Sequence, residues 1–254
     1  MPIITDPLFW GLAIPAFLLS GISKGGFASG GGNAAVPLMA LAIPAPQAAG
    51  IALPVLCAMD IAGLRAWWGK WSVQELRAIL PGGLLGIALG TAVFGLMSDQ
   101  AVKLMVGLIA LVFLARSLWQ ARPGRVAPPP ATSSPRRGGF WGAVSGLTST
   151  IAHAGGPPLA VYLYPLRLDR ATLAATPVVF FAVLNYAKLV PYFFLGQLSA
   201  TNMLTSLLLL PLAPVGVRMG VWLAQRMSDL WFYRVIYVML GVTGTKLVWD
   251  GLGL

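Results

Sequence analysis

The chain has 254 residues and a net charge of +10; 57% of its residues are hydrophobic, only 9% are charged, and its mean hydropathy is +0.81. So few polar side chains cannot cover the surface of a soluble globular protein of this length. The composition excludes that class and predicts a polytopic membrane protein. We place most of its cations in short loops between apolar segments rather than on a surface that binds nucleic acid.

Apolar segments follow one another along the chain in two groups of five. We place the first group at 8–22, 34–43, 48–64, 78–97 and 102–118, and the second at 140–152, 158–166, 171–195, 203–225 and 235–250. Between them, residues 120–137 contain three consecutive prolines and four arginines, a composition typical of an exposed linker. We therefore divide the chain into a first membrane repeat (1–119), a linker (120–137) and a second membrane repeat (138–254).

The two halves share short sequence matches at corresponding places. Phe9-Trp10-Gly11 recurs as Phe140-Trp141-Gly142, and Leu80-Pro81 recurs 130 residues later as Leu210-Pro211. Such self-similarity indicates an internal repeat.

Lysines and arginines are distributed differently in the two halves. In the first half they follow the third and fifth segments, whereas in the second half they follow the second and fourth. Because cytoplasmic loops carry the excess of Lys and Arg, this pattern predicts a cytoplasmic linker and two periplasmic termini. With an odd number of passages in each half, the second repeat is then an inverted copy of the first.

Several segments are too short to cross a membrane alone. The ten residues 34–43 cover about 15 Å of a hydrocarbon core that is about 30 Å thick. The predicted fold class is therefore an all-α polytopic membrane protein with two inverted-topology repeats. Each repeat has a broken or re-entrant helical hairpin followed by three transmembrane helices, and fully spanning hairpins are the alternative.

Glycine-rich breaks occupy matching places in the two halves, at 24–33 and 148–158. Irregular backbone at membrane depth is tolerated where it lines protein or a wet cavity, and paired breaks point to a transporter's binding site. Asn33 suits the N-cap of one helix, and Pro157-Pro158 suits the first turn of another. We expect both helix N-termini to attract an anion within the membrane. Tight helix packing through small residues is the alternative.

We select substrate-binding candidates from the two breaks and from one arginine inside an apolar segment, Arg218. Lys24 supplies a point charge or, alternatively, extends to the lipid headgroups. His153, the only histidine, binds the anion, takes part in proton coupling, or is a neutral hydrogen-bonded residue. The candidate substrate-binding residues are Lys24, Ser29, Gly31, Gly32, Asn33, Ser149, Thr150, His153, Gly155, Gly156 and Arg218.

Two further charged residues lie inside apolar segments. Arg218 lies within 203–225 and Asp60 within 48–64, so we expect each to face a partner or water rather than lipid. We predict an Asp60–Arg218 ion pair, with Arg65 as the alternative partner, and its role is either structural or in substrate or proton binding. Arg65 and Lys188 are expected to extend to the headgroups.

The residue inventory offers little for catalysis or for a bound cofactor. Cys57 is the only cysteine and Glu75 the only glutamate, and the usual hydrolase, nucleotide-binding and zinc-protease motifs are absent from the sequence. We therefore expect no enzyme activity, no metal and no cofactor.

The run Gly21-x-x-x-Gly25-x-x-x-x-Gly30-Gly31-Gly32-x-x-x-Val36-Pro37, the repeated halves and the glycines from Pro81 to Gly90 resemble the TauE/SafE family of sulfite and sulfonate exporters, also grouped with toluene-sulfonate uptake permeases. The resemblance implies a multi-pass carrier in the bacterial inner membrane for small sulfur-containing or organic anions, without a cofactor.

From these features together we predict a secondary transporter, and more specifically an exporter, that works by alternating access with the substrate between two hairpin tips. An anion channel with the same cavity is the alternative. The expected partners are a small anionic substrate and membrane lipid, with no nucleic acid, and the coupling ion and a homo-oligomer are left open.

Overall fold

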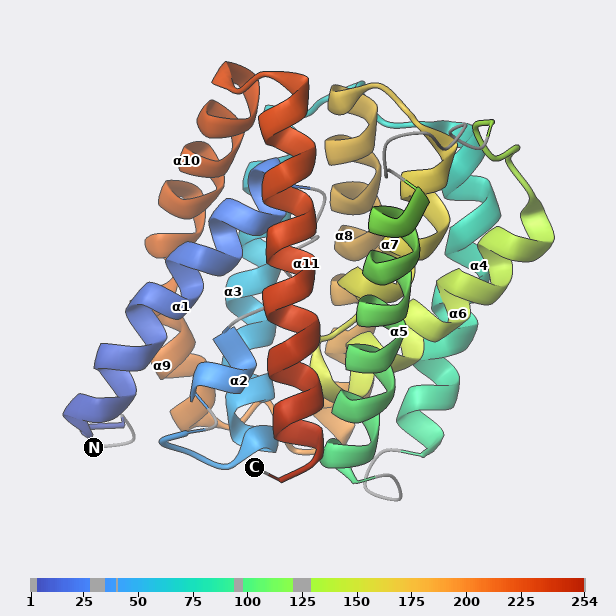
Figure 1. Ribbon diagram of the computed structural model, residues 1–254. Helices are drawn as coiled ribbons and strands as arrows, with labels where there is room; N and C mark the ends of the chain where they lie inside the picture. Colours follow the sequence, from blue (N-terminus) through green and yellow to red (C-terminus); the bar gives the residue numbers. More distant parts are fainter. Residues whose placement is uncertain (1–3, 28–34, 40, 94–97, 121–128, 254) are drawn as a thin grey trace.

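The computed structural model describes residues 4–27, 35–39, 41–93, 98–120 and 129–253, and every regular element in these ranges is a helix. Figure 1 shows the helices as one bundle. In chain order they are α1 (Pro7–Gly26), α2 (Ala35–Met39), α3 (Ala45–Ala66), α4 (Val73–Ala92), α5 (Asp99–Gln120), α6 (Pro135–Ala152), α7 (Gly156–Leu163) with the 3-10 turn η1 (Tyr164–Leu166), α8 (Arg170–Phe194), α9 (Ala200–Leu209), α10 (Leu212–Arg226) and α11 (Asp229–Gly251).

Each of the ten apolar segments contains a helix, but some boundaries differ from the prediction. α1 runs to Gly26 rather than to residue 22, because its last turn packs against α10 and stays helical. α6 begins at Pro135, inside the predicted linker, where the Ser134 side chain accepts a hydrogen bond from the Arg137 amide (3.4 Å) and caps the helix. The segment 203–225 forms two helices, α9 and α10, that meet at Leu210-Pro211 with a bend of 44°.

Three helices in the described ranges are long and apolar enough to cross a membrane, namely Pro7–Gly26, Pro46–Ala66 and Arg170–Phe194. The bent pair of α9 and α10 makes a fourth if it counts as one span. α1 therefore has the length of a full span, whereas α2, with five residues, and α7, with eight, do not.

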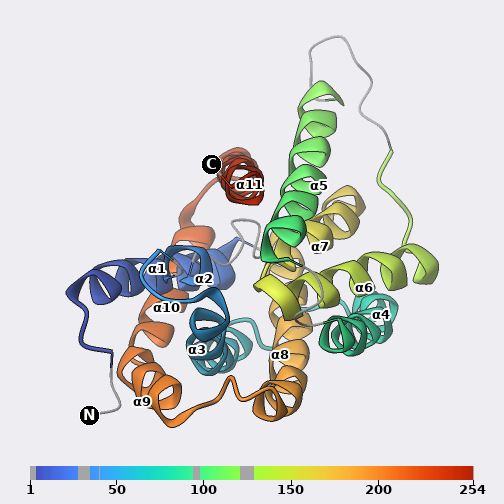
Figure 2. The same cartoon turned by 90° about the horizontal axis from the view of Figure 1, so that it is seen from below.

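One end of the bundle carries most of the cations. The first and last described residues both lie at the other end (Figure 1), apart from one another (Figure 2). The cation-rich end includes the end of α3, the starts of α4, α6, α8 and α11, and the end of α10. Its cations are Arg65, Lys70, Arg77, Arg136, Arg137, Arg167, Arg170, Arg226 and Arg234.

α6 and α7 form a helical hairpin, and the start of α6 and the end of α7 lie toward the cation-rich end. The Ala131 amide, just before α6, donates to the carbonyl of Pro165 in η1 (2.8 Å), and the Ser134 amide donates to the Tyr162 hydroxyl (3.4 Å). In the other half, the Ala35 amide at the start of α2 donates to the Ser20 hydroxyl of α1 (3.1 Å).

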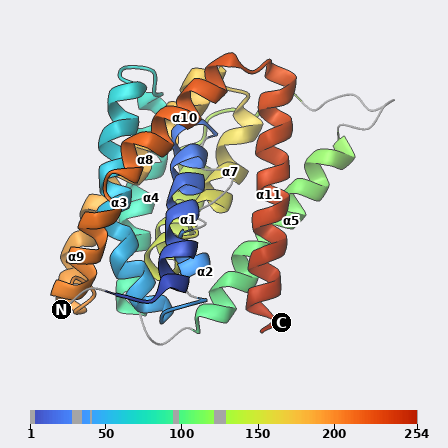
Figure 3. The same ribbon diagram turned by 90° about the vertical axis from the view of Figure 1, so that its left-hand side faces the viewer.

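Glycines bring helices of the two halves into backbone contact. α1 packs on α10, and α4 packs on α6, as Figures 2 and 3 show. A methyl group on Gly26 would overlap the carbonyl of Gly220, and one on Gly82 would overlap the carbonyl of Gly139. Small-residue contacts of this kind are the usual way in which membrane helices approach closely. Part of the glycine pattern is therefore explained by packing.

The buried apolar side chains form two main clusters. One joins α1, α2 and α3 to α9, α10 and Tyr192 near the end of α8. The other joins α4 and α7 to the first half of α8, together with Phe27 and Ala224. α8 contributes to both clusters and lies between them (Figure 2).

Candidate functional site

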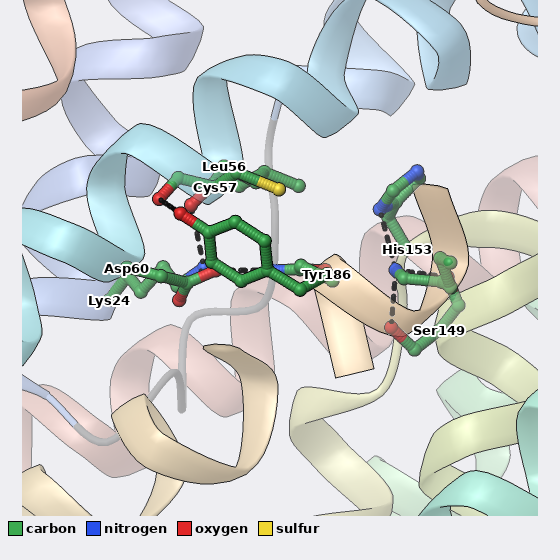
Figure 4. A network of polar contacts seen from close by, with 9 residues as sticks. Lys24, Leu56, Cys57, Asp60, Ser149, His153 and Tyr186 are labelled. Atoms are coloured by element: carbon green, nitrogen blue, oxygen red, sulfur yellow. Dashed lines mark hydrogen bonds and ion pairs between the residues drawn. The ribbon is translucent and has the colours of Figure 1, made fainter. Parts of the chain in front are cut away.

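A buried ion pair joins α1 to α3. Lys24 Nζ lies 2.6 Å from a carboxylate oxygen of Asp60 and also donates to the carbonyl of Leu56 (3.3 Å). The second carboxylate oxygen of Asp60 accepts from the side-chain amide of Asn185 on α8 (2.7 Å). Lys24 is 7% exposed and Asp60 fully buried, so Lys24 does not extend to the headgroups. Figure 4 shows Lys24 and Asp60 pointing toward one another.

The predicted Asp60–Arg218 pair is wrong, since Lys24 is the cation that pairs with Asp60. The buried residues of α10, which face α1 and α3, are Ala213, Gly216, Val217, Gly220 and Ala224. Arg218 lies outside this helical stripe and is exposed. Asp60 does not pair with Arg65 either, and Arg65 is exposed as expected.

A second buried cation, Lys188 on α8, lies against the end of α6. Its Nζ donates to the carbonyl of Ser149 (3.2 Å) and to the Ser149 hydroxyl (3.0 Å), and it lies 3.4 Å from Nδ1 of His153. Lys188 is 0% exposed. The expectation that it extends to the headgroups is therefore wrong.

His153 ends α6 in a left-handed backbone conformation, with φ of 50°. Its side chain is buried between Lys188 and Tyr192 of α8. The Tyr192 hydroxyl lies 3.1 Å from Nε2 and donates to the carbonyl of Thr150 (2.8 Å), one of the last carbonyls of α6. The single proton of the Tyr192 hydroxyl is thus used, so Nε2–H of His153 is the donor in the contact between them.

α8 holds the two polar clusters on one face. Asn185 and Lys188 are three residues apart, and Tyr192 follows four residues later, so all three lie on neighbouring turns of one side. In Figure 4, Lys24, Asp60 and Tyr186 form one group, and Ser149 and His153 form the other. We call these residues, with Asn185, Lys188 and Tyr192, the α8 network.

The charges of the α8 network do not balance. Among the described residues, the buried lysine, histidine and carboxylate side chains of this network are Lys24, Lys188, His153 and Asp60. The other buried carboxylate in the described ranges, Glu75, accepts a hydrogen bond from Tyr162 (2.6 Å) near the cation-rich end. The network therefore contains two lysines and one carboxylate, so with a neutral histidine and both lysines protonated it has an excess of one positive charge.

The remaining predicted residues have different surroundings. Ser149 contacts Lys188, whereas the Thr150 hydroxyl bonds back to Gly146 of its own helix (2.8 Å). Gly155 and Gly156 are buried at the start of α7, and a methyl group on Gly155 would lie 2.7 Å from the carbonyl oxygen of Ser145. Ser29, Gly31, Gly32 and Asn33 lie outside the described residues.

Sequence reasoning missed Asn185, Lys188 and Tyr192 as members of a site. The available signal was the pair of polar residues at Asn185 and Lys188, three apart in a long apolar segment, because polar groups inside a span usually face the protein interior. The position of Lys188 within its apolar segment does not by itself show that its side chain belongs to a buried site.

Comparison with known protein families shows to which family the chain belongs. The sequence model described as "Sulfite exporter TauE/SafE" matches residues 13–247. The chain belongs to the TauE/SafE family. As a TauE/SafE protein it is an integral membrane protein of a family of transporters rather than enzymes. No curated protein and no solved structure matches the chain.

Proposed function

We propose that this TauE/SafE protein is a secondary transporter of small anions such as sulfite, organosulfonates or related organic acids. The observation that carries the proposal is the second buried lysine of the α8 network, Lys188, which has no carboxylate to balance a positive charge. A buried cation is stable only when it is paired or hydrogen-bonded, and an unbalanced one attracts an anion into the protein interior. Lys24, Lys188, Ser149 and His153 are the residues that we assign to this attraction.

The position of the network agrees with a substrate site between two hairpins. Lys24 lies in the last turn of α1, at the first residue of the first glycine-rich break, and His153 lies at the end of α6, in the second break. The two are joined through α8 rather than by direct contact. We assign the substrate to the space between these two helix ends, with Ser29, Gly31, Gly32, Asn33, Gly155 and Gly156 of the breaks as further contacts.

The packing of the helices supports an inverted repeat. If α1, α3, α4 and α5 correspond to α6, α8, α9–α10 and α11, the contact of α1 with α10 corresponds to that of α6 with α4. The contacts of α3 with α8 and of α5 with α11 each join two corresponding helices, so exchange of the two halves leaves these contacts unchanged. A two-fold relation between the halves produces this pattern, and it is the architecture in which a central site opens alternately to each side.

We further propose that the cation-rich end faces the cytoplasm of a bacterial cell, which places the linker there and both termini in the periplasm. In an inside-negative membrane, an anion that crosses alone gains about 2.3 kcal/mol per 100 mV on leaving the cell. Export is the direction that we assign, in agreement with the family description; the membrane potential contributes to it only where the anion moves without a coupled proton.

Counterflow in proteoliposomes tests this function. Liposomes loaded with unlabelled sulfite, methanesulfonate, sulfoacetate or acetate should take up the same labelled anion transiently above equilibrium, because a carrier exchanges one substrate for another. Flux that does not saturate and shows no counterflow would identify an anion channel instead. Absence of protein-dependent flux for every anion would refute the proposal.

A further inference from the structure

The partners of Lys188 fit its amine in either protonation state. The carbonyl of Ser149 and Nδ1 of the neutral His153 only accept, but the Ser149 hydroxyl can donate or accept. An ammonium donates to all three. A neutral amine donates to the carbonyl and to Nδ1 and accepts from the hydroxyl, so it also leaves no hydrogen-bonding group unused.

Lys24 has partners of a different kind. Its Nζ faces the carbonyl of Leu56 and the carboxylate of Asp60, which are both acceptors. A neutral amine could donate to both, but its lone pair would face no donor and the carboxylate would lose its counter-charge, so the ammonium is the form that fits these partners. Lys24 is thus fixed as a cation, whereas Lys188 can gain or lose a proton without rearrangement of its neighbours.

The surroundings of Lys188 determine which form is stable when no anion is bound. Lys188 is sealed from water, and the one carboxylate in the network is held by Lys24 and Asn185. A buried charge without a counter-charge is normally neutralised by loss of its proton. The ionisable groups around Lys188 are Lys24 from α1, Asp60 and Cys57 from α3, His153 from α6, and Tyr186 and Tyr192 from α8 itself. By sequence, residues 28–34 contribute no ionisable side chain.

We propose that Lys188 binds one proton with each monovalent anion and releases both together on the other side of the membrane, an inference that rests on the proposed transport function. On loading, the neutral amine takes up a proton from the solution and the resulting ammonium pairs with the anion. On release, the anion leaves and the proton returns to the solution on the opposite side. The network then has the same total charge when empty and when loaded.

This coupling changes what drives transport. Because the loaded and empty sites carry equal charge, the membrane potential does no work on the cycle. Net export then occurs when the outward gradient of the anion exceeds the opposing proton gradient, so the protein acts as an outlet for an anion that accumulates in the cytoplasm. An anion that crosses alone would instead change its equilibrium distribution about tenfold for a potential of about 60 mV.

Wild-type protein in liposomes with a trapped pH-sensitive dye provides the test. Methanesulfonate is the first probe, because a sulfonate stays a monoanion and cannot carry the proton itself, and bisulfite is the second. As methanesulfonate leaves, the lumen should become more alkaline by one proton per anion, and a valinomycin and potassium potential of about 60 mV should leave the flux unchanged. A constant lumen pH with flux that follows the potential would overturn the coupling.

The two proposals fail in different ways. Intact counterflow without proton movement refutes only the role of Lys188, whereas no counterflow with any of the four anions named above refutes the transporter and the coupling together. The variant Lys188→Arg keeps a permanent charge, so its remaining flux should carry no protons and should follow the potential by up to about tenfold per 60 mV. Lys70→Arg, at an exposed lysine, is the matched control and should behave as wild type. The wild-type measurement decides the question even if the larger arginine prevents folding.

Discussion

Replacement of Lys24 by Met should destabilise the protein strongly, because it leaves the carboxylate of Asp60 buried without its cation. Asp60 is fully buried, its oxygen lies 2.6 Å from Nζ of Lys24, and Asn185 is its other partner. Removal of one member of a buried ion pair costs about 3–5 kcal/mol. For a chain of this length, that cost lowers the melting temperature by roughly 6–20 °C.

Thermal unfolding of purified protein in detergent measures this effect, and Lys70→Met, which removes an exposed lysine, serves as the control. The double variant Lys24→Met with Asp60→Asn should recover at least half of the loss, because the introduced side chain keeps an oxygen for the amide of Asn185 and carries no charge. A Lys24→Met protein that melts with wild type would refute the reasoning. Additive losses in the double variant would also show that the two charges do not interact.

Three further changes test other parts of the structure. Gly82→Ala should lower the melting temperature by several degrees, because its methyl group meets the carbonyl of Gly139, whereas Gly139→Ala, with no atom closer than 3.9 Å, should leave it unchanged or raised. Gly155→Leu should abolish counterflow but leave membrane insertion intact, as judged by its amount in the membrane fraction; wild-type flux would exclude the second break from the mechanism. Tyr192→Phe should cost about 1–3 kcal/mol in thermal unfolding because the carbonyl of Thr150 loses its donor. Tyr186→Phe should not, since its hydroxyl is 3.5 Å from the carbonyl of Cys57.

The helices could be predicted from the sequence because membrane segments are recognisable locally. A run of apolar residues between charged loops is sufficient, and all ten predicted segments contain helix. The predicted helix boundaries were wrong where a tertiary contact or a helix cap determined where the helix begins or ends. Gly25 and Gly26 continue α1 because α10 packs against them, although glycine alone favours neither a helix nor its continuation. Ser134 starts α6 within a stretch whose prolines and arginines resemble a linker.

The site could be predicted only in part, because its partners come from distant positions. Lys24, Ser149 and His153 stood out beside the glycine-rich breaks, but the break itself did not reveal that Lys24 pairs with Asp60. Arg218 was a reasonable partner by charge and depth alone. The choice between the two cations depends on which side of its helix each occupies, and the packing of α10 on α1 turns Arg218 outward.

The glycine contacts also determine which parts of the protein can move against each other. These contacts pack α1 against α10 and α6 against α4, so the backbones of the two halves are in close contact at both places. Motion of one sequence half against the other would separate these surfaces and lose many dispersion contacts at once. The two apolar clusters instead meet along α8, where the connection includes a few hydrogen bonds from Asn185, Lys188 and Tyr192. Hydrogen bonds of this kind can be exchanged for bonds to water or substrate at low net cost. We therefore expect a change of access to occur along α8, at the lysine that we propose to carry the proton.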